Sequence, residues 1–221
     1  MSQIDNPVHQ IKYDLDSMFE LVSRQLSKTK EALENFDKDL AHEVTQTEKR
    51  VNSLELQIDR ACENFIALFN PVAIDLRFVL AVLKINSNLE RIGDIAEGLS
   101  KYVIESQHAF DKDLITEANV FPMFDAGLIM MADVKNAFEN EDTSTARKVF
   151  KSDDYLDHIN LEAIHLLTEG IKSNPAKVED ALYIISVIRK LERVGDQVKN
   201  IAEEIIFYIE AKVLKHSNSR K

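Results

Sequence analysis

The most distinctive chemistry in this 221-residue chain lies in two copies of one short motif. Residues 89–94 read Leu-Glu-Arg-Ile-Gly-Asp and residues 191–196 read Leu-Glu-Arg-Val-Gly-Asp, so five of the six positions are identical at an offset of 102. Each copy places a glutamate four residues before an aspartate, which sets both carboxylates on one face of a helix. Carboxylate oxygens are the ligands that hard cations such as Mg²⁺ and Mn²⁺ prefer.

Two other polar pairs have the same spacing of four residues. Glu48 with Asn52, and Asp153 with Asp157, lie at the flanks of apolar stripes on two further predicted helices. The motif carboxylates fall opposite the apolar stripes of their own helices, and they are Glu90, Asp94, Glu192 and Asp196. Neighbouring helices could therefore bring flanks and motifs together along a shallow groove.

Each copy of the repeated motif lowers the stability of its helix unless another group compensates for it. Two carboxylates four residues apart on a helix cost about 0.2–0.5 kcal/mol, and a glycine inside a helix costs about 1 kcal/mol relative to alanine. Over both copies these costs reach about 2–3 kcal/mol, against a typical domain stability of about 5–15 kcal/mol. A bound cation would offset them, with Gly93 and Gly195 leaving room for close approach. The alternative is a solvated charged face in which Arg91 and Arg193 neutralise the acids.

Long helices are needed to position these side chains, and the composition favours them. The chain has 5 Gly, 4 Pro and 45% hydrophobic residues, which excludes both a turn-rich β fold and a disordered chain. Prolines and capping residues predict six helices, at roughly 10–34, 38–68, 72–107, 120–139, 143–171 and 176–214.

The long repeat indicates a duplicated unit, because about 100 residues can form a three-helix bundle alone. We therefore expect an all-α fold of two tandem three-helix bundles related by internal duplication. Their predicted bounds are residues 10–108 and 117–214, and the polar stretch 106–119 is the predicted linker.

Charge and cysteine content narrow the functional classes. The formal net charge is -11 and the pI is near 5.1, which argues against nucleic acid as a partner. Cys62, the single cysteine, fits a reducing compartment and is expected to be a small core residue. We find no signal-peptide pattern and no apolar run of about 20 residues, so we expect a cytoplasmic protein, peripheral to a membrane at most. The basic stretch 212–221 is expected to be a solvated tail.

At these motifs the sequence resembles the PhoU family of regulators of bacterial phosphate uptake. The resemblance extends from about residue 10 to 214 and includes the two motif copies, Glu48-Lys-Arg-Val-Asn52, Ile58-Asp-Arg-Ala-Cys62 and the connector Asn70-Pro-Val-Ala-Ile-Asp-Leu-Arg77. It implies two three-helix bundles. It also implies surface clusters of iron, zinc or another metal, such as magnesium or manganese, held by Glu/Asp-x-x-x-Asp pairs.

The resemblance carries over to two ligand sets. The second bundle would use Asp153, Asp157, Glu192 and Asp196, and the first would use Glu48, Asn52, Glu90 and Asp94. Asn52 stands where many family members have aspartate, which removes one anionic ligand. We therefore expect the second site to bind a cation more tightly than the first.

The resemblance also implies a role without enzymatic chemistry. Such a protein is a cytoplasmic adaptor between the ATPase subunit of the phosphate ABC transporter and a sensor histidine kinase, and it keeps phosphate-starvation genes off. The sequence contains no P-loop and no Gly-x-Ser-x-Gly motif, in keeping with that role. The family implies a homodimer, and the apolar run 205–209 is a candidate interface because it is apolar all round its helix.

Two other interpretations remain open. One is a helical scaffold without metal, or a regulator of another transporter with the same fold. The other is a di-iron carboxylate oxidoreductase, because Glu105 with His108 and Glu162 with His165 form two Glu-x-x-His sequences. Their separation of 57 residues breaks the 102-residue repeat, which argues against this enzyme class.

Overall fold

The computed structural model describes residues 5–214, and this part of the chain contains helices and no strand. The helices are α1 (Asp5–Asn35), α2 (Lys38–Phe69), α3 (Ile74–Glu105), α4 (Lys112–Glu117), α5 (Val120–Asn140), α6 (Thr143–Ser173), the 3₁₀ helix η1 (Pro175–Lys177) and α7 (Val178–Glu210). The predicted all-α class is confirmed. The basic stretch predicted at the C-terminus lies outside the described residues beyond position 214.

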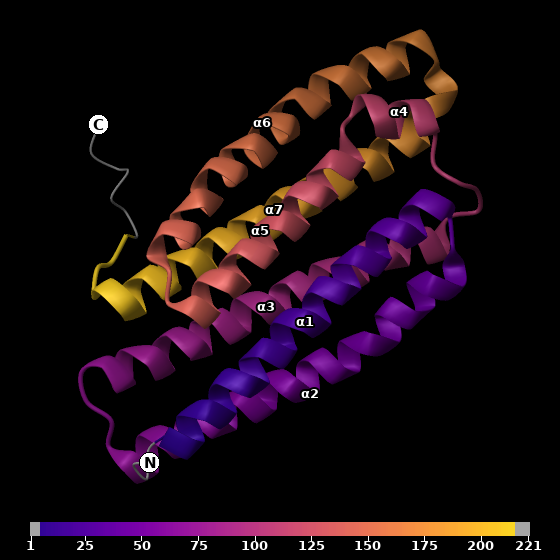
Figure 1. Ribbon diagram of the computed structural model, residues 1–221. Coiled ribbons are helices and arrows are strands. Elements are labelled where there is room, and N and C mark those ends of the chain that lie inside the picture. The colour runs from indigo at the N-terminus through magenta and orange to yellow at the C-terminus, as the bar shows by residue number, and fades with distance from the viewer. Residues whose placement is uncertain (1–4, 215–221) are drawn as a thin grey trace.

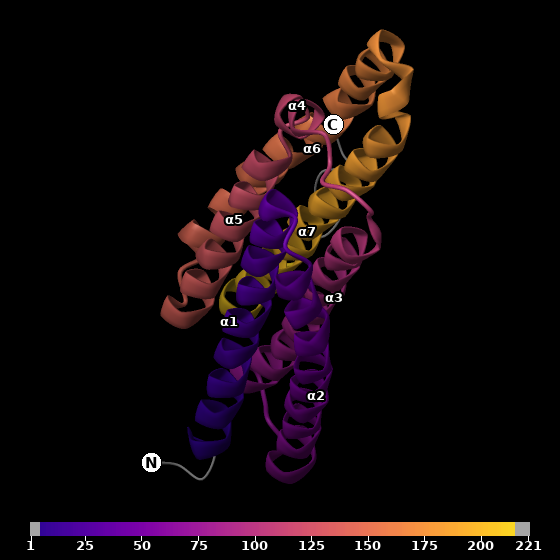
Figure 2. The ribbon, with the colours of Figure 1, turned by 90° about the vertical axis from the view of Figure 1, so that its right-hand side faces the viewer.

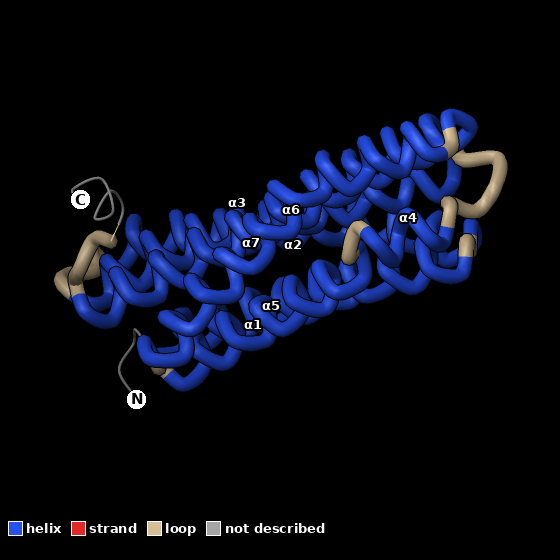
Figure 3. Tube along the Cα trace, turned by 90° about the horizontal axis from the view of Figure 1, so that it is seen from above, coloured by secondary structure: helices blue, strands red, loops and turns tan. Residues whose placement is uncertain are grey.

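Two three-helix bundles lie side by side, as the duplication predicts (Figure 1). Helices α1, α2 and α3 pack together in the first bundle, and α5, α6 and α7 pack together in the second. The bundles meet through α1 and α3 on one side and α5 and α7 on the other, so that α2 and α6 lie at the outside (Figure 2). Viewed from above, all the long helices run along the length of the molecule (Figure 3). The buried apolar side chains of both bundles form one continuous core.

The breaks between helices occur at residues suited to capping. Asp37 and Asp142 begin α2 and α6, and each side chain accepts a hydrogen bond from a backbone N–H two or three residues later. Asn70 ends α2 in the left-handed conformation that asparagine tolerates. Pro7 lies in the first turn of α1 and Pro175 opens η1, positions where the missing N–H costs little.

The predicted linker differs from the structure, because residues 112–117 form the short helix α4. Asp111 caps this helix by accepting a hydrogen bond from the backbone N–H of Leu114, and its carboxylate also pairs with Lys177 at 2.9 Å. Leu114 and Ile115 are buried in the core. Because the stretch 106–119 is polar overall, its sequence did not indicate that Leu114 and Ile115 would be buried. The last helix also ends at Glu210, four residues before the predicted end.

Helices α3 and α7 pack in opposite directions in the middle of the molecule (Figure 1). Cross-helix contacts in order along α3 are Arg77 with Tyr208, Lys84 with Glu204, Asn88 with Asn200, and Tyr102 with Tyr183. This register places the two motif copies, residues 89–94 and 191–196, opposite one another.

The apolar run 205–209 contributes mainly to the core of this chain. Ile205 and Ile206 are fully buried, and the hydroxyl of buried Tyr208 donates a hydrogen bond to Glu141 at 2.5 Å. The Tyr208 ring also packs edge-on against Phe78. The homodimer stays a prediction.

Among the described residues, no helix combines the length and apolar character that a bilayer span requires.

Candidate metal centres

The first candidate centre is built around Glu48, a carboxylate on α2 that is only 5% exposed. The side-chain amide of Gln25 on α1 donates a hydrogen bond to its Oε2 atom at 3.0 Å. A Cβ atom at Gly93 of α3 would lie 3.1 Å from the same oxygen. Glycine at this position therefore allows α3 to approach the buried carboxylate closely.

Carboxylates of α3 lie close enough to Glu48 to act on its charge. Burial raises the pKa of Glu48, and the charges of Asp94 and Glu97 raise it further. The pKa of Glu90 is raised to about 7, mainly by burial and then by the charges of Asp94, Glu55 and Glu48. Glu48 and Glu90 thus ionise against the negative charges of neighbouring acids, and a cation placed among these carboxylates would favour their ionised forms.

The structure adds a carboxylate to the residues that the sequence indicates for this cluster. Asn52 is exposed at the surface, as Asp94 is. Glu55, one turn further along α2, is half-buried and its charge acts on Glu90. Burial raises the pKa of Glu55, with additions from Asp59 and Asp94. The signal that could have identified it is the spacing of four residues between Glu55 and Asp59, which matches the spacing in the two motif copies.

Three buried oxygen atoms near this cluster lack a hydrogen-bond donor among the described residues. They are Oε1 of Glu48, Oε1 of Gln25 and Oδ1 of Asn86, and all three side chains are at least nine-tenths buried. The amide nitrogen of Asn86 donates to Asp59 at 2.9 Å, whereas its Oδ1 atom has no donor within residues 5–214. An unpaired buried oxygen costs about 1–3 kcal/mol, and a hard cation would remove that cost. The residues present therefore fit a cation.

The second candidate centre is built around Asp153 on α6, which is 1% exposed. Its Oδ2 atom pairs with the ammonium group of Lys199 on α7, and its Oδ1 atom has no donor in the described part of the chain. A Cβ atom at Gly195 would lie 3.0 Å from that Oδ1 atom and 2.6 Å from a methyl carbon of Leu156. Gly195 therefore lets α7 approach α6, as Gly93 lets α3 approach α2.

The four predicted carboxylates of the second centre act on one another. Burial raises the pKa of Asp153 against the lowering effect of Lys199, and the charges of Asp157 and Asp196 raise it further. Burial raises the pKa of Glu192, followed by the charges of Asp196, Asp157 and Asp153. The structure thus brings together the residues that the duplicated motif predicted here, although Asp153 is far more deeply buried than its position at the flank of a stripe indicated.

The two centres differ in charge at one repeat-related position. Lys199 lies 102 residues after Glu97, so the same site in the duplicated motif carries opposite charges. Lys199 neutralises part of the second centre through Asp153, whereas Glu97 adds negative charge near Glu48 in the first. Within residues 5–214, no three His, Cys, Asp or Glu side chains already converge closely enough to hold a metal ion.

The remaining candidate residues lie apart from both centres. The two Glu-x-x-His pairs are exposed on the surface, so the core of a di-iron enzyme is not formed; they are Glu105, His108, Glu162 and His165. Cys62 is fully buried, and burial raises the pKa of its thiol to about 12, followed by the charges of Asp59 and Glu63. It is a core residue, as predicted.

A family model described as the PhoU domain matches residues 15–103 and 122–205, one match in each bundle. The chain belongs to the PhoU family. The resemblance inferred from the duplicated motif and the proline connector is thereby confirmed.

Curated PhoU relatives match over nearly the whole chain. The "Phosphate-specific transport system accessory protein PhoU homolog 1" of Thermotoga maritima is 31% identical, with 93% of this chain and 88% of the relative covered. The "Phosphate-specific transport system accessory protein PhoU" of Escherichia coli is 29% identical, with 97% and 88% covered.

Solved PhoU structures have the same fold. PhoU from Pseudomonas aeruginosa matches with a TM-score of 0.86 at 28% identity, covering 95% of this chain and 100% of that one. The phosphate transport system regulatory protein PhoU from Streptococcus pneumoniae matches with a TM-score of 0.83 at 25% identity, covering 96% and 99%.

Proposed function

We propose that this protein is a cytoplasmic regulator of phosphate uptake that keeps phosphate-starvation signalling off when phosphate is plentiful. The observation that carries the proposal is the PhoU match in both bundles, together with relatives named as accessory proteins of the phosphate-specific transport system. Its partners would be the ATPase subunit of the phosphate ABC transporter and a sensor histidine kinase. It would act as a homodimer through binding, without enzymatic chemistry.

The two carboxylate centres would hold divalent cations. The first would use Glu48, Glu55, Glu90 and Asp94, with the unpaired amide oxygens of Gln25 and Asn86 nearby. The second would use Asp153, Asp157, Glu192 and Asp196. All of these donors are oxygen atoms, which favours Mg²⁺ or Mn²⁺ over softer metals such as zinc. A bound cation would supply positive charge that lets the buried carboxylates stay ionised.

The first centre would bind a cation more tightly than the second, which reverses the order expected from Asn52 alone. Glu55, whose charge acts on Glu90, would supply the anionic ligand that Asn52 lacks. In the second centre a cation would have to compete with Lys199 for Asp153. Cation binding at that centre is therefore an exchange of one positive charge for another.

The regulatory role is tested by deleting the gene and measuring an alkaline phosphatase reporter in high phosphate. Loss of repression, restored by the wild-type gene, is the expected result. Repression that persists in the deletion strain would remove the proposed role. Binding of the purified protein to the transporter ATPase and to the kinase domains then distinguishes an adaptor from a regulator of another transporter.

Metal binding is tested separately, by elemental analysis of protein purified without chelator and by Mn²⁺ titration of resin-stripped protein. Asp94→Asn should weaken the tighter binding step and Asp157→Asn the weaker one. A stripped protein that takes up no cation would leave the regulatory proposal standing and would favour the metal-free scaffold.

A further inference from the structure

A cleft of about 570 Å³ opens between α3 and α7, at the seam between the two bundles. Four basic side chains line it, and they are Arg91, Lys101, Lys190 and Arg193. Two carboxylates, Asp94 and Glu97, also reach it. The cleft is therefore locally positive in a chain whose net charge is -11, and such an island attracts anions from solution.

The two arginines hold repeat-related positions and are brought into one cleft by the antiparallel packing of α3 and α7. Arg91 and Arg193 follow the glutamate in the two motif copies, 102 residues apart. Both are exposed, and across residues 5–214 neither forms a salt bridge with the neighbouring acids. They act on Glu90 and Glu192 only through space. The guanidinium groups thus keep their donors available for an added partner.

Lys190 also lies in the cleft, and no carboxylate among residues 5–214 pairs with it. Its ammonium group lies 5.7 Å from the centre of the Tyr102 ring, at the distance of a cation–π contact. A Cβ atom at Gly98 would lie only 2.9 Å from that ammonium nitrogen, so the absence of a side chain there makes room for it. Lys101, by contrast, pairs with Glu97 at 2.7 Å.

The chemistry of these groups indicates which anion they suit. A guanidinium group offers parallel N–H donors that match the oxygens of a phosphoryl group. Two such groups, one from each bundle, would engage two phosphoryl groups better than one. The volume lies within the range of small-molecule sites, about 300–1,000 Å³, and far exceeds the space of a single phosphate ion. A second cleft of about 410 Å³ shares Lys190 and Arg193 and extends the basic surface towards Arg189.

We propose that this cleft binds a small molecule that carries two or more phosphoryl groups. The proposal goes beyond regulation of phosphate uptake and does not require a metal ion. It is nevertheless connected to the first carboxylate centre, because Asp94 belongs to both. A cation that neutralises Asp94 would leave the cleft more positive and strengthen anion binding.

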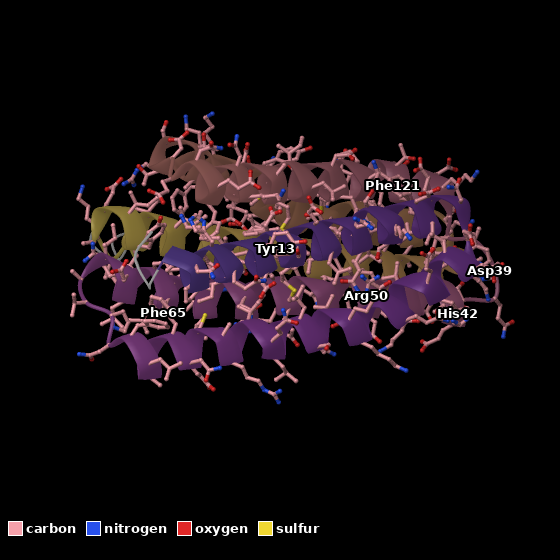
Figure 4. All side chains as sticks on the ribbon, turned by 60° about the horizontal axis from the view of Figure 1, so that its bottom comes forward. Tyr13, Asp39, His42, Arg50, Phe65 and Phe121 are labelled. Atoms are coloured by element: carbon pink, nitrogen blue, oxygen red, sulfur yellow. The ribbon has the colours of Figure 1, made fainter. Side chains whose placement is uncertain are left out.

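The test is calorimetric titration of the full-length, resin-stripped protein with pyrophosphate, ATP, inorganic phosphate and sulfate. Pyrophosphate or ATP should bind at least about tenfold more tightly than inorganic phosphate or sulfate. Arg91→Gln and Arg193→Gln should each weaken this binding by about tenfold or more. The matched control is Arg50→Gln, an exposed arginine on α2 outside the cleft (Figure 4), which should change the affinity by less than about twofold.

Several results would overturn the proposal. These are no binding of pyrophosphate or ATP at about 5 mM, equal affinity for inorganic phosphate, or equal weakening by the Arg50 control. An acidic peptide that binds in the cleft where pyrophosphate does not would assign the surface to a protein partner instead. Because all three arginines are exposed, urea unfolding midpoints equal to that of the wild type establish that the variants are folded. Failure here leaves the reporter experiment on phosphate signalling unaffected.

Discussion

Replacing Lys199 with glutamine removes the cation that neutralises Asp153 inside the second carboxylate centre. Asp153 is 1% exposed, so its charge has little access to water, whereas the Lys199 side chain is 36% exposed. Breaking a buried ion pair by removing one partner costs about 3–5 kcal/mol. Because water reaches Lys199 and weakens the pair, we expect a smaller loss of unfolding free energy, about 2 kcal/mol in metal-free protein at pH 8.

The loss of unfolding free energy caused by this substitution should depend on pH. Asp153 has a raised pKa in the folded protein, and loss of Lys199 raises it further, so the variant takes up a proton more readily than the wild type. A neutral carboxyl group does not need a cation. The loss of stability should therefore be greatest at pH 8 and should shrink as the pH falls towards the ordinary pKa of aspartate, 3.8.

Urea unfolding at pH 8 and pH 5 measures the loss, which corresponds to a midpoint shift of about 1 M at pH 8. Lys151→Gln is the matched control, because Lys151 is exposed on α6, two residues before Asp153. Saturating Mn²⁺ should restore more stability to the Lys199 variant than to the wild type, since the cation no longer competes with an ammonium group. A loss below about 0.5 kcal/mol, or an equal loss at both pH values, would refute the counter-ion role.

Three further outcomes follow from the geometry. The metal-free protein should lose stability as the pH rises from about 4.5 to about 7, because the raised pKa of Glu90 makes its ionisation harder in the folded than in the unfolded chain. Urea unfolding with and without Mn²⁺ measures this loss, and the cation should reverse it. Gly195→Val should destabilise the protein by about 2 kcal/mol in urea unfolding, since the valine Cβ atom would meet Leu156 at 2.6 Å and separate Asp153 from α7. Unchanged stability would contradict this contact. Cys62 should react with a thiol reagent only at the rate of local unfolding, and rapid labelling of native protein would refute its burial.

Much of the fold was predictable because its determinants are local in sequence. Asp37, Asn70 and Asp142 mark helix ends through their own side-chain and backbone chemistry. The motif copies revealed the duplication directly. Helix α4 was not predicted, because a six-residue helix has too few residues to show a periodicity, and its stability depends on burying Leu114 and on the distant Lys177.

The candidate site was predictable only in its residue types and spacing. The depth at which Glu48 and Asp153 are buried depends on how closely two helices approach, which Gly93 and Gly195 permit but the helical pattern alone does not specify. The role of Glu55 likewise depends on the rotation of α2 against α3. The pairing of Lys199 with Asp153 joins residues 46 positions apart on different helices, so spacing within one helix could not reveal it.

The antiparallel packing of α3 against α7 relates the two motif copies by an approximate twofold axis within one chain. In a symmetric pair of identical chains every substitution appears twice, so both halves of such a seam must carry the same charge. Here the halves share a single chain, and Glu97 and Lys199 carry opposite charges at the same repeat position. Covalent linkage thus frees the two halves to specialise: the buried carboxylate of the first centre, Glu48, accepts from a neutral amide, whereas that of the second, Asp153, pairs with a lysine.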